Sequence, residues 1–288
     1  MNKLNFLSLL MLAVLVNFSI NAQESQPNVA ITLERGPCFG ACPIYTITIL
    51  EDGTVIYEGQ RFVEVIGEQR TEIDPETVAL MVESFENAGY FDWDEAYDTR
   101  TITDLPTVIT SVTRNDETHR ILRYTGDSTA PLALPYLEMW IDVMVNSQLW
   151  TGAEPDIYTV SIDSDAPLIT LQREPCFGFC PVYNLTLFED GMIVYMSIAN
   201  VDEIGVRVFE TDAFAITSIA QMASSVGYFD WQDSYEVQVM TDQATVITSI
   251  RWGGQFKRIV RYDGDPNAPI GLIWIEESID QLITDLAG

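Results

Sequence analysis

Basic residues are scarce in this sequence. Only 14 Lys and Arg stand against 43 Asp and Glu, and the formal net charge is −29. Proteins that bind nucleic acids neutralise phosphates with lysine and arginine side chains, and attraction to anionic lipids needs the same residues. A surface this acidic repels such polyanions and favours a well-solvated protein. We therefore expect no nucleic-acid partner.

Histidine is almost absent, since His119 is the single one in the chain. A Ser-His-Asp catalytic set therefore cannot be built twice, and no Asp-x-Asp-x-Asp-Gly calcium loop occurs. His119 flanks a polar hairpin, where we expect a solvated side chain. Asp127 and Asp265 are expected to cap turns. We predict no catalytic residue, no metal ligand and no cofactor, and the protein is more consistent with a non-enzyme.

Long apolar runs are missing except near the N-terminus. There Lys3 precedes an apolar run over residues 4–16 and a polar stretch that ends at Ala22, which is the layout of a secretory signal peptide. A run of about 13 residues is shorter than the ~20 that span a bilayer. We predict a signal peptide at 1–22, a tail at 23–28, export to the periplasm or the extracellular space, and no membrane insertion after signal cleavage.

The sequence contains an internal repeat. The alignment that places Cys38 on Cys176 runs without a gap and leaves about 46 of 120 positions identical. It also pairs Gly89 with Gly227 at the start of a shared Gly-Tyr-Phe-Asp-Trp segment. We predict one repeat domain at 29–150, a linker at 151–166 that is rich in Asp, Ser, Thr and Pro, and a second repeat domain at 167–288.

Each repeat has the pattern of an α+β domain. Alternating apolar residues predict strands, and an Asp-Gly pair at Gly53 and again at Gly191 predicts a hairpin between two of them. A fourth strand is expected at residues 62–66. Asp74 and the proline that follows predict the start of a helix. The predicted order is strand, strand, strand, strand, helix, strand, strand, helix, which makes an antiparallel sheet with two helices on one face.

The four cysteines form one Cys-x-x-x-Cys-Pro motif in each repeat. In an oxidising compartment such cysteines form disulfides, and the duplication favours pairing within each repeat, Cys38 with Cys42 and Cys176 with Cys180. Two alternatives stay open. A short ring can be redox-active, and the motif resembles the metal-binding motif of Sco-type copper chaperones, in which a distant histidine completes the site.

Aromatic residues gather after the first helix of each repeat. Together with neighbouring acids they could bind a glycan or a peptide, although a plug between helix and sheet is the other interpretation. These candidate partner-binding residues are Tyr90, Trp93, Tyr97, Tyr228, Trp231 and Tyr235.

The cysteine motif and the shared Asp-Gly, Tyr-Phe and Thr-Asp pairs resemble a domain family of unknown function that occurs in exported bacterial proteins. The resemblance implies the compartment and the domain limits but no activity. We expect an exported, non-enzymatic binding or structural module, braced by disulfides, that presents its surfaces twice to a protein, peptide or glycan, because two linked sites raise avidity. The alternative is a thiol–disulfide redox or copper-handling protein.

Overall fold

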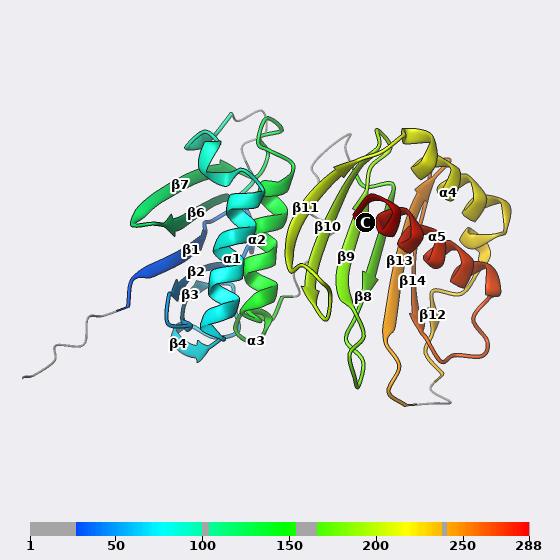
Figure 1. Cartoon of the computed structure of the whole chain (residues 1–288), viewed down its shortest axis with the longest axis horizontal. Coiled ribbons are helices and arrows are strands. Elements are labelled where there is room, and N and C mark those ends of the chain that lie inside the picture. Colours follow the sequence, from blue (N-terminus) through cyan, green and yellow to red (C-terminus); the bar gives the residue numbers. More distant parts are fainter. Residues whose placement is uncertain (1–26, 100–103, 154–165, 238–240, 288) are drawn as a thin grey trace, which may run out of the picture.

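The computed structural model describes residues 27–99, 104–153, 166–237 and 241–287 and folds them into two similar α+β units (Figure 1). The predicted signal peptide at 1–22 and most of the predicted linker at 151–166 lie outside the described residues. Within the described ranges, no helix is both long and apolar enough to cross a bilayer. The two units confirm the predicted fold class and its duplication.

The first unit is built on a seven-stranded sheet in the order β4-β3-β2-β1-β6-β7-β5. Neighbouring strands are antiparallel except for the two-residue β5, which runs parallel to β7. Residues along β2 alternate between buried and half-buried, so one face of the sheet is covered. The strands are β1 (Val29–Arg35), β2 (Ile44–Leu50), β3 (Thr54–Arg61), β4 (Gly67–Glu72), β5 (Ala96–Tyr97), β6 (Thr107–Arg114) and β7 (Glu117–Tyr124).

Helices α1 (Pro75–Asn87) and α2 (Ala133–Met144) cover one face of this sheet. The start of α1 is as predicted, because the side chain of Asp74 accepts the amide N–H of Glu76. Gly89 follows the helix with a φ of 87° and leads into a short 3-10 helix, η1 (Tyr90–Asp92). A four-residue helix, α3 (Gln148–Thr151), comes after α2.

The second unit repeats this order, and its sheet runs β11-β10-β9-β8-β13-β14-β12. Its elements are β8 (Ile169–Arg173), β9 (Val182–Leu187), β10 (Met192–Ala199), β11 (Gly205–Glu210), α4 (Ala213–Ser225), η2 (Tyr228–Asp230), β12 (Ser234–Tyr235), β13 (Thr245–Trp252), β14 (Gln255–Tyr262) and α5 (Ile270–Ala287).

The fourth strand does not lie at residues 62–66, as the sequence pattern predicts, but at Gly67–Glu72. Phe62 has a φ of 55° and lies in the connection between β3 and β4. The prediction is wrong because β4 is an edge strand with polar residues on both faces, and so lacks the apolar alternation that marks a strand.

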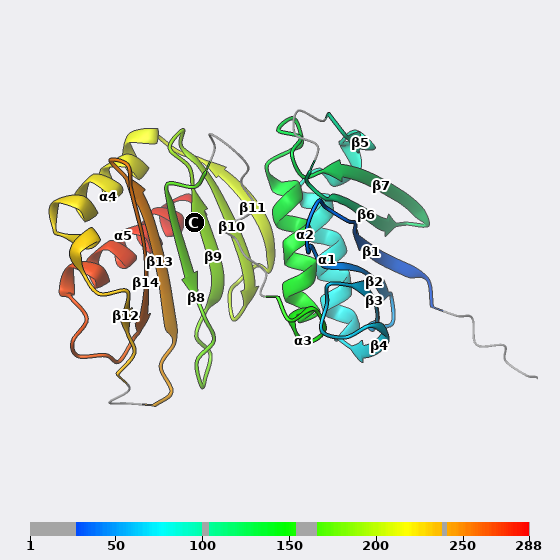
Figure 2. The same ribbon diagram turned by 180° about the vertical axis from the view of Figure 1, so that it is seen from behind.

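The two units stack as four layers, which Figures 1 and 2 show from opposite sides. The first sheet is followed by helices α1 and α2, then by the second sheet, and finally by α4 and α5. Helix α2 contacts β10 and β11, and α1 contacts β11. The helices of the first repeat are therefore covered on both sides, by their own sheet and by the outer face of the second sheet.

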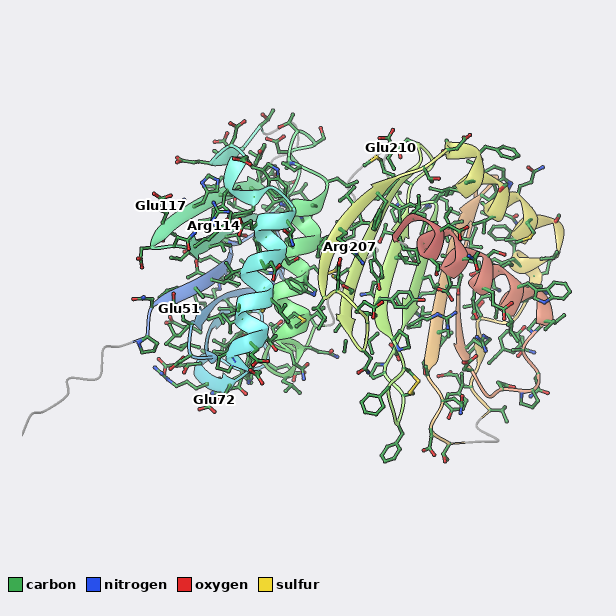
Figure 3. The ribbon with its side chains drawn as sticks, viewed as in Figure 1. Glu51, Glu72, Arg114, Glu117, Arg207 and Glu210 are labelled. Atoms are coloured by element: carbon green, nitrogen blue, oxygen red, sulfur yellow. A yellow bond between two sulfur atoms is a disulfide. The ribbon has the colours of Figure 1, made fainter. Side chains whose placement is uncertain are left out.

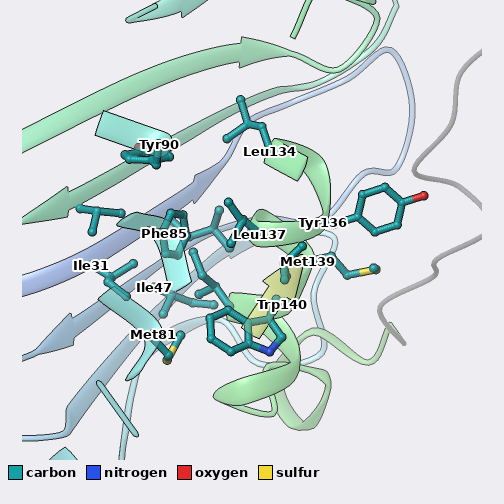
Figure 4. Close-up of a cluster of buried hydrophobic side chains, with 14 of the residues drawn as sticks. Ile31, Ile47, Met81, Phe85, Tyr90, Leu134, Tyr136, Leu137, Met139 and Trp140 are labelled. Carbon is teal, nitrogen blue, oxygen red and sulfur yellow. The ribbon is translucent and has the colours of Figure 1, made fainter. Parts of the chain in front are cut away.

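A shared apolar core joins the repeats. Trp140 is fully buried in it, and its Nε1 donates a hydrogen bond of 3.1 Å to the carbonyl oxygen of Ser197. Val194, Met196 and Val206 of the second sheet belong to the same cluster as the core of the first repeat. In Figure 4, Tyr136 and Met139 extend from α2 on the side opposite to Ile31 and Ile47.

The residues that differ between the repeats account for this stacking. Residues of the shared interface are apolar, whereas their counterparts on the uncovered sheet face of the first repeat and the uncovered helix face of the second are mostly polar or charged. The aligned pairs are Met196 with Glu58, Val206 with Glu68, Met139 with Glu277 and Trp140 with Ser278.

A glycine lies where the two units approach each other closely. A Cβ on Gly205 would lie 2.5 Å from Oγ of Ser84, whereas a Cβ on the aligned Gly67 would meet nothing within 4 Å. The same Ser84 hydroxyl accepts a hydrogen bond of 3.0 Å from the amide of Val206. Any side chain at position 205 would therefore push α1 away from β11.

Candidate functional site

A disulfide closes the loop between the first two strands of each repeat. Cys38 is bonded to Cys42, and Cys176 is bonded to Cys180, which confirms the predicted pairing. The paired Cα atoms lie 5.8 Å and 5.7 Å apart, within the usual range for a disulfide. Each repeat therefore carries its own covalent brace.

The rings present phenylalanine side chains to solvent. Phe39 is 87% exposed, and in the second ring Phe177 and Phe179 are 88% and 93% exposed. These are the most exposed large apolar side chains of the described residues, so the rings are not held by packing of their own side chains. The first ring is tied instead by the backbone, since the amide of Phe39 donates to the carbonyl of Asp104.

The histidine of the copper alternative lies far from the first ring. Next to the ring, the amide of Gly36 binds the carbonyl of Thr107 at the start of β6. His119 pairs with Val112, further along the same strand and roughly 16 Å away at about 3.3 Å per residue. His119 therefore cannot complete a metal site with Cys38.

A polar network fastens the second helix of the first repeat to its sheet. Arg35 donates to a carboxylate oxygen of Asp142 from Nε at 2.9 Å and from a terminal nitrogen at 2.6 Å, and the hydroxyl of Tyr45 donates to the other oxygen at 2.7 Å. One turn earlier on α2, Glu138 forms a buried ion pair with Arg123. Burial and the Asp142 carboxylate raise the pKa of Tyr45 above its ordinary value.

The second repeat contains the same network on α5. Arg173 donates from Nε to Asp280 at 3.0 Å, Tyr183 donates to the same carboxylate at 2.5 Å, and Arg261 pairs with Glu276 at 2.5 Å. Burial raises the pKa of Glu276, while its ion pair with Arg261 opposes the rise. Charges buried in this way fix one geometry and are costly to leave unpaired, so we interpret the network as structural.

Beside this network the second repeat has an open groove. It lies between the last turns of α5 and the strands β9 to β11 with the β10–β11 connection, and its volume is about 540 Å³. We call it the α5 groove. Its lining includes Tyr183, Tyr195, Val201, Arg207, Asp280 and Thr284.

The α5 groove combines aromatic rings with charged groups. The ring centroids of Tyr183 and Tyr195 lie 5.5 Å apart, and the guanidinium of Arg207 stands 5.2 Å from the Tyr195 centroid. Arg207, which extends from β11 (Figure 3), also pairs with Glu203 at 2.6 Å. Burial raises the pKa of Tyr195. Such a set of groups suits non-covalent binding of an aromatic or planar polar group.

The corresponding groove of the first repeat is filled by the chain itself. The ring of Trp150, in α3, lies 5.0 Å from that of Tyr57, which aligns with Tyr195. The amide of Val65 donates to the carbonyl of Trp150 at 2.9 Å, and the amide of Glu64 donates to the carbonyl of Thr151 at 3.3 Å. Burial raises the pKa of Tyr57 to about 12. The two repeats thus share a groove but differ in what occupies it.

A family model described as a domain of unknown function, DUF6438, matches residues 29–145 and 167–283. The chain belongs to this family. The match confirms the resemblance predicted from the cysteine motif, and it makes each repeat one DUF6438 domain. A search of curated proteins finds no match to the chain. The family therefore accounts for the duplicated fold and assigns no activity to it.

The candidate aromatic residues lie mainly inside the DUF6438 domains. Tyr90 and Tyr228 are fully buried, and their hydroxyls donate to the carbonyls of Thr110 and Thr248. Tyr97 and Tyr235 are 8% and 7% exposed, and their hydroxyls accept backbone amides. These four rings plug the space between helix and sheet, and only Trp93 and Trp231 are half-buried. Partner binding at those two rings stays a prediction.

His119 is not the solvated residue that the hairpin pattern predicts. It is half-buried, its ring meets that of Tyr90 edge-on at 5.4 Å, and its Nε2 is buried without a hydrogen-bond partner among the described residues. The prediction is wrong because η1 folds back over the flank of the hairpin. In the second domain Lys257 takes this place and pairs with Asp233 at 2.7 Å.

The turn-capping role predicted for the Gly-Asp loops is confirmed. One oxygen of Asp127 accepts the amide of Thr129 and the other accepts that of Thr99, each at 2.8 Å. Asp265 binds its own loop in the same way. Burial alone would raise the pKa of Asp127, but these hydrogen bonds outweigh it and lower the pKa.

Proposed function

We propose that the protein is an exported, non-enzymatic binding module whose ligand occupies the α5 groove, and that the first DUF6438 domain has a mainly structural role. The observation that carries this proposal is the contrast between the two grooves. One is filled by Trp150, and the aligned one is open and lined by two tyrosines and an arginine. Such a contrast is expected when one domain binds the ligand and the other has a structural role.

Export is supported by the two disulfides, because such bonds persist in oxidising compartments and are rare in the cytosol. It is supported further by the signal-peptide pattern of the first 22 residues. The acidic composition fits a well-solvated protein that avoids nucleic acid and anionic lipid.

The duplication presents the disulfide rings twice, with Phe39 and Phe177 both exposed, but it does not present the helix layer or the groove twice. The helix layer of the first domain is covered by the second sheet, and its groove holds Trp150. We therefore propose one principal binding site per chain.

The test is site-specific photo-crosslinking in cells that produce the protein. A photoreactive amino acid replaces Thr284, an exposed residue of the α5 groove, and in a matched variant it replaces Asn146, the aligned exposed residue of the first domain. We expect a discrete adduct from position 284 and none from position 146. Equal labelling from both positions, or none from either, would contradict the proposal. The mass of the adduct shows whether the ligand is a peptide, a protein or a glycan.

A further inference from the structure

We propose that the α5 groove binds a short peptide segment of a partner protein that carries an aromatic side chain, held as the first domain holds its own Trp150. The inference rests on the proposed function, because it names the ligand class of the same groove. The inference comes from the chain itself, because the groove of the first domain already holds the segment that carries Trp150.

The first domain supplies the template for this complex. A short helical turn lies in its groove, with the indole of Trp150 tilted by 30° against the ring of Tyr57 at a centroid distance of 5.0 Å. The two carbonyls at the end of that turn, of Trp150 and Thr151, accept the amides of Val65 and Glu64. One aromatic contact and two consecutive backbone hydrogen bonds therefore hold the segment, and this is a recognition mode that a separate peptide can reproduce.

The second domain keeps the receiving groups. Tyr195 aligns with Tyr57, and Asp202 and Glu203 align with the two amide donors. All three residues line the α5 groove, and within the described part of the chain the amides of Asp202 and Glu203 have no acceptor. The sequence position aligned with Trp150 is Gly288, which carries no indole. The groove thus has the donors and the aromatic floor without the ring that covers them in the first domain.

The differences between the two grooves point to the character of the peptide. Arg207 replaces Gln69, and its guanidinium lies over Tyr195 at 5.2 Å, where it gives an incoming aromatic ring a planar cation to stack on. Asp202 and Glu203 place carboxylates at the rim, on a chain whose net charge is −29. Complementary charge speeds association and excludes wrong partners, so a peptide with basic residues beside its aromatic residue fits best.

The experiment uses the full chain and a fluorescent synthetic peptide with the sequence of residues 146–153, with a second peptide that has alanine in place of the tryptophan. Fluorescence anisotropy measures both affinities. We expect saturable binding of one tryptophan peptide per chain and roughly tenfold weaker binding of the alanine peptide, as for an aromatic anchor in a pocket. Addition of lysines to the tryptophan peptide should tighten binding at low salt.

Two protein variants locate the site. Thr284→Trp places a bulky ring at the exposed rim of the α5 groove and should weaken binding at least about tenfold. Ser278→Trp places the same ring on the uncovered helix face, where the aligned residue of the first domain is Trp140, and should leave binding unchanged.

The inference is overturned if the tryptophan peptide does not bind at millimolar concentration, if both peptides bind equally, or if the two α5 variants behave alike. If an adduct forms from position 284 in cells while the peptide does not bind, the peptide class is wrong and the groove keeps its proposed role. If neither signal is seen, both proposals fall.

Discussion

Val194 is the residue at which the stacking of the two domains can be tested most directly. It lies on the outer face of the second sheet, is 1% exposed, and packs in the cluster that includes Trp140 of the first domain. Its aligned residue, Ile56, lies on the outer face of the first sheet, where it is half-buried. We therefore compare Val194→Glu with Ile56→Glu, which change the same sheet position in a covered and an uncovered setting.

The magnitudes differ because only one of the two positions is covered. Complete burial of a valine side chain is worth about 1.5–3 kcal/mol, and an unpaired charge left in a buried position costs a further ~3–5 kcal/mol. Val194→Glu should therefore destabilise the stacked form by more than about 4 kcal/mol, unless the interface opens and lets the carboxylate reach water. Ile56→Glu adds its carboxylate to a face that already carries Glu58 and Glu68, and should cost about 1 kcal/mol or less.

Urea unfolding gives the free energies, and small-angle X-ray scattering gives the radius of gyration. We expect Val194→Glu to lower the unfolding midpoint sharply, or to separate unfolding into two transitions with a larger radius of gyration. We expect Ile56→Glu to match the unmodified protein in both measurements. Equal effects of the two substitutions, with unchanged scattering, would refute the covered interface.

Three further predictions follow from buried charges, a turn cap and the disulfide rings. Glu276→Gln should cost about 1–3 kcal/mol in urea unfolding, because it removes one of the two carboxylates that the buried guanidinium of Arg261 faces and leaves the pair with Asp263, while Glu68→Gln, in an exposed pair, should cost less than about 1 kcal/mol. Folding lowers the pKa of Asp127 below 3.8, so its carboxylate stabilises the fold above that pH, and this stabilisation is lost as the pH falls through the folded pKa. Asp127→Asn should therefore be less stable than the unmodified protein by roughly 1 kcal/mol at pH 7. The difference should vanish in strong acid. Replacing Cys38 and Cys42 by serine should cost about 2 kcal/mol, and alkylation with mass spectrometry should find no free thiol in the native protein.

The strands and helices with strong local signals could be predicted from the sequence. The Asp-Gly turn at Gly53 is one example, since a Cβ there would lie 2.1 Å from the carbonyl oxygen of Ile73 and the φ is 91°. The N-cap at Asp74 is another. Elements without a local signal were not predictable. The edge strand β4 is polar on both faces, and the two-residue β5 pairs with β7 only because η1 brings it there.

The polar network and the groove were harder to foresee, for two different reasons. Glu138 and Asp142 lie one helical turn apart and are identical in the second repeat, so their repetition was a usable signal that buried partners exist. The partners themselves, Arg35 and Arg123, come from distant strands, and only the folded sheet brings them to one helix. Whether the groove is open or filled depends on whether Trp150 packs against the sheet, and no local sequence pattern predicts this.

The stacking itself had a signal in the sequence. Of the four residues on the outer face of the strand at 54–60, Thr54, Glu58 and Gln60 are polar and only Ile56 is apolar, whereas the aligned residues 192–198 are apolar at nearly every position. Loss of alternation indicates a strand that is buried on both sides. Positions at which the copies agree report the fold of one domain, and positions at which they differ report how one domain packs on the other.

The same differences set the character of the two outer faces of the stack. A contact between the helix face of one unit and the sheet face of the next is heterologous, and such contacts propagate into filaments unless something closes them. Here the two outer faces carry more polar residues than the buried contact does, Glu58 and Glu68 on the free sheet and Glu277 and Ser278 on the free helices, although the free helices also expose Trp274. A third unit would have to bury these groups without partners, at a cost of several kcal/mol. The carboxylates on the outer faces therefore disfavour the addition of a further unit, whereas the α5 groove is open among the described residues.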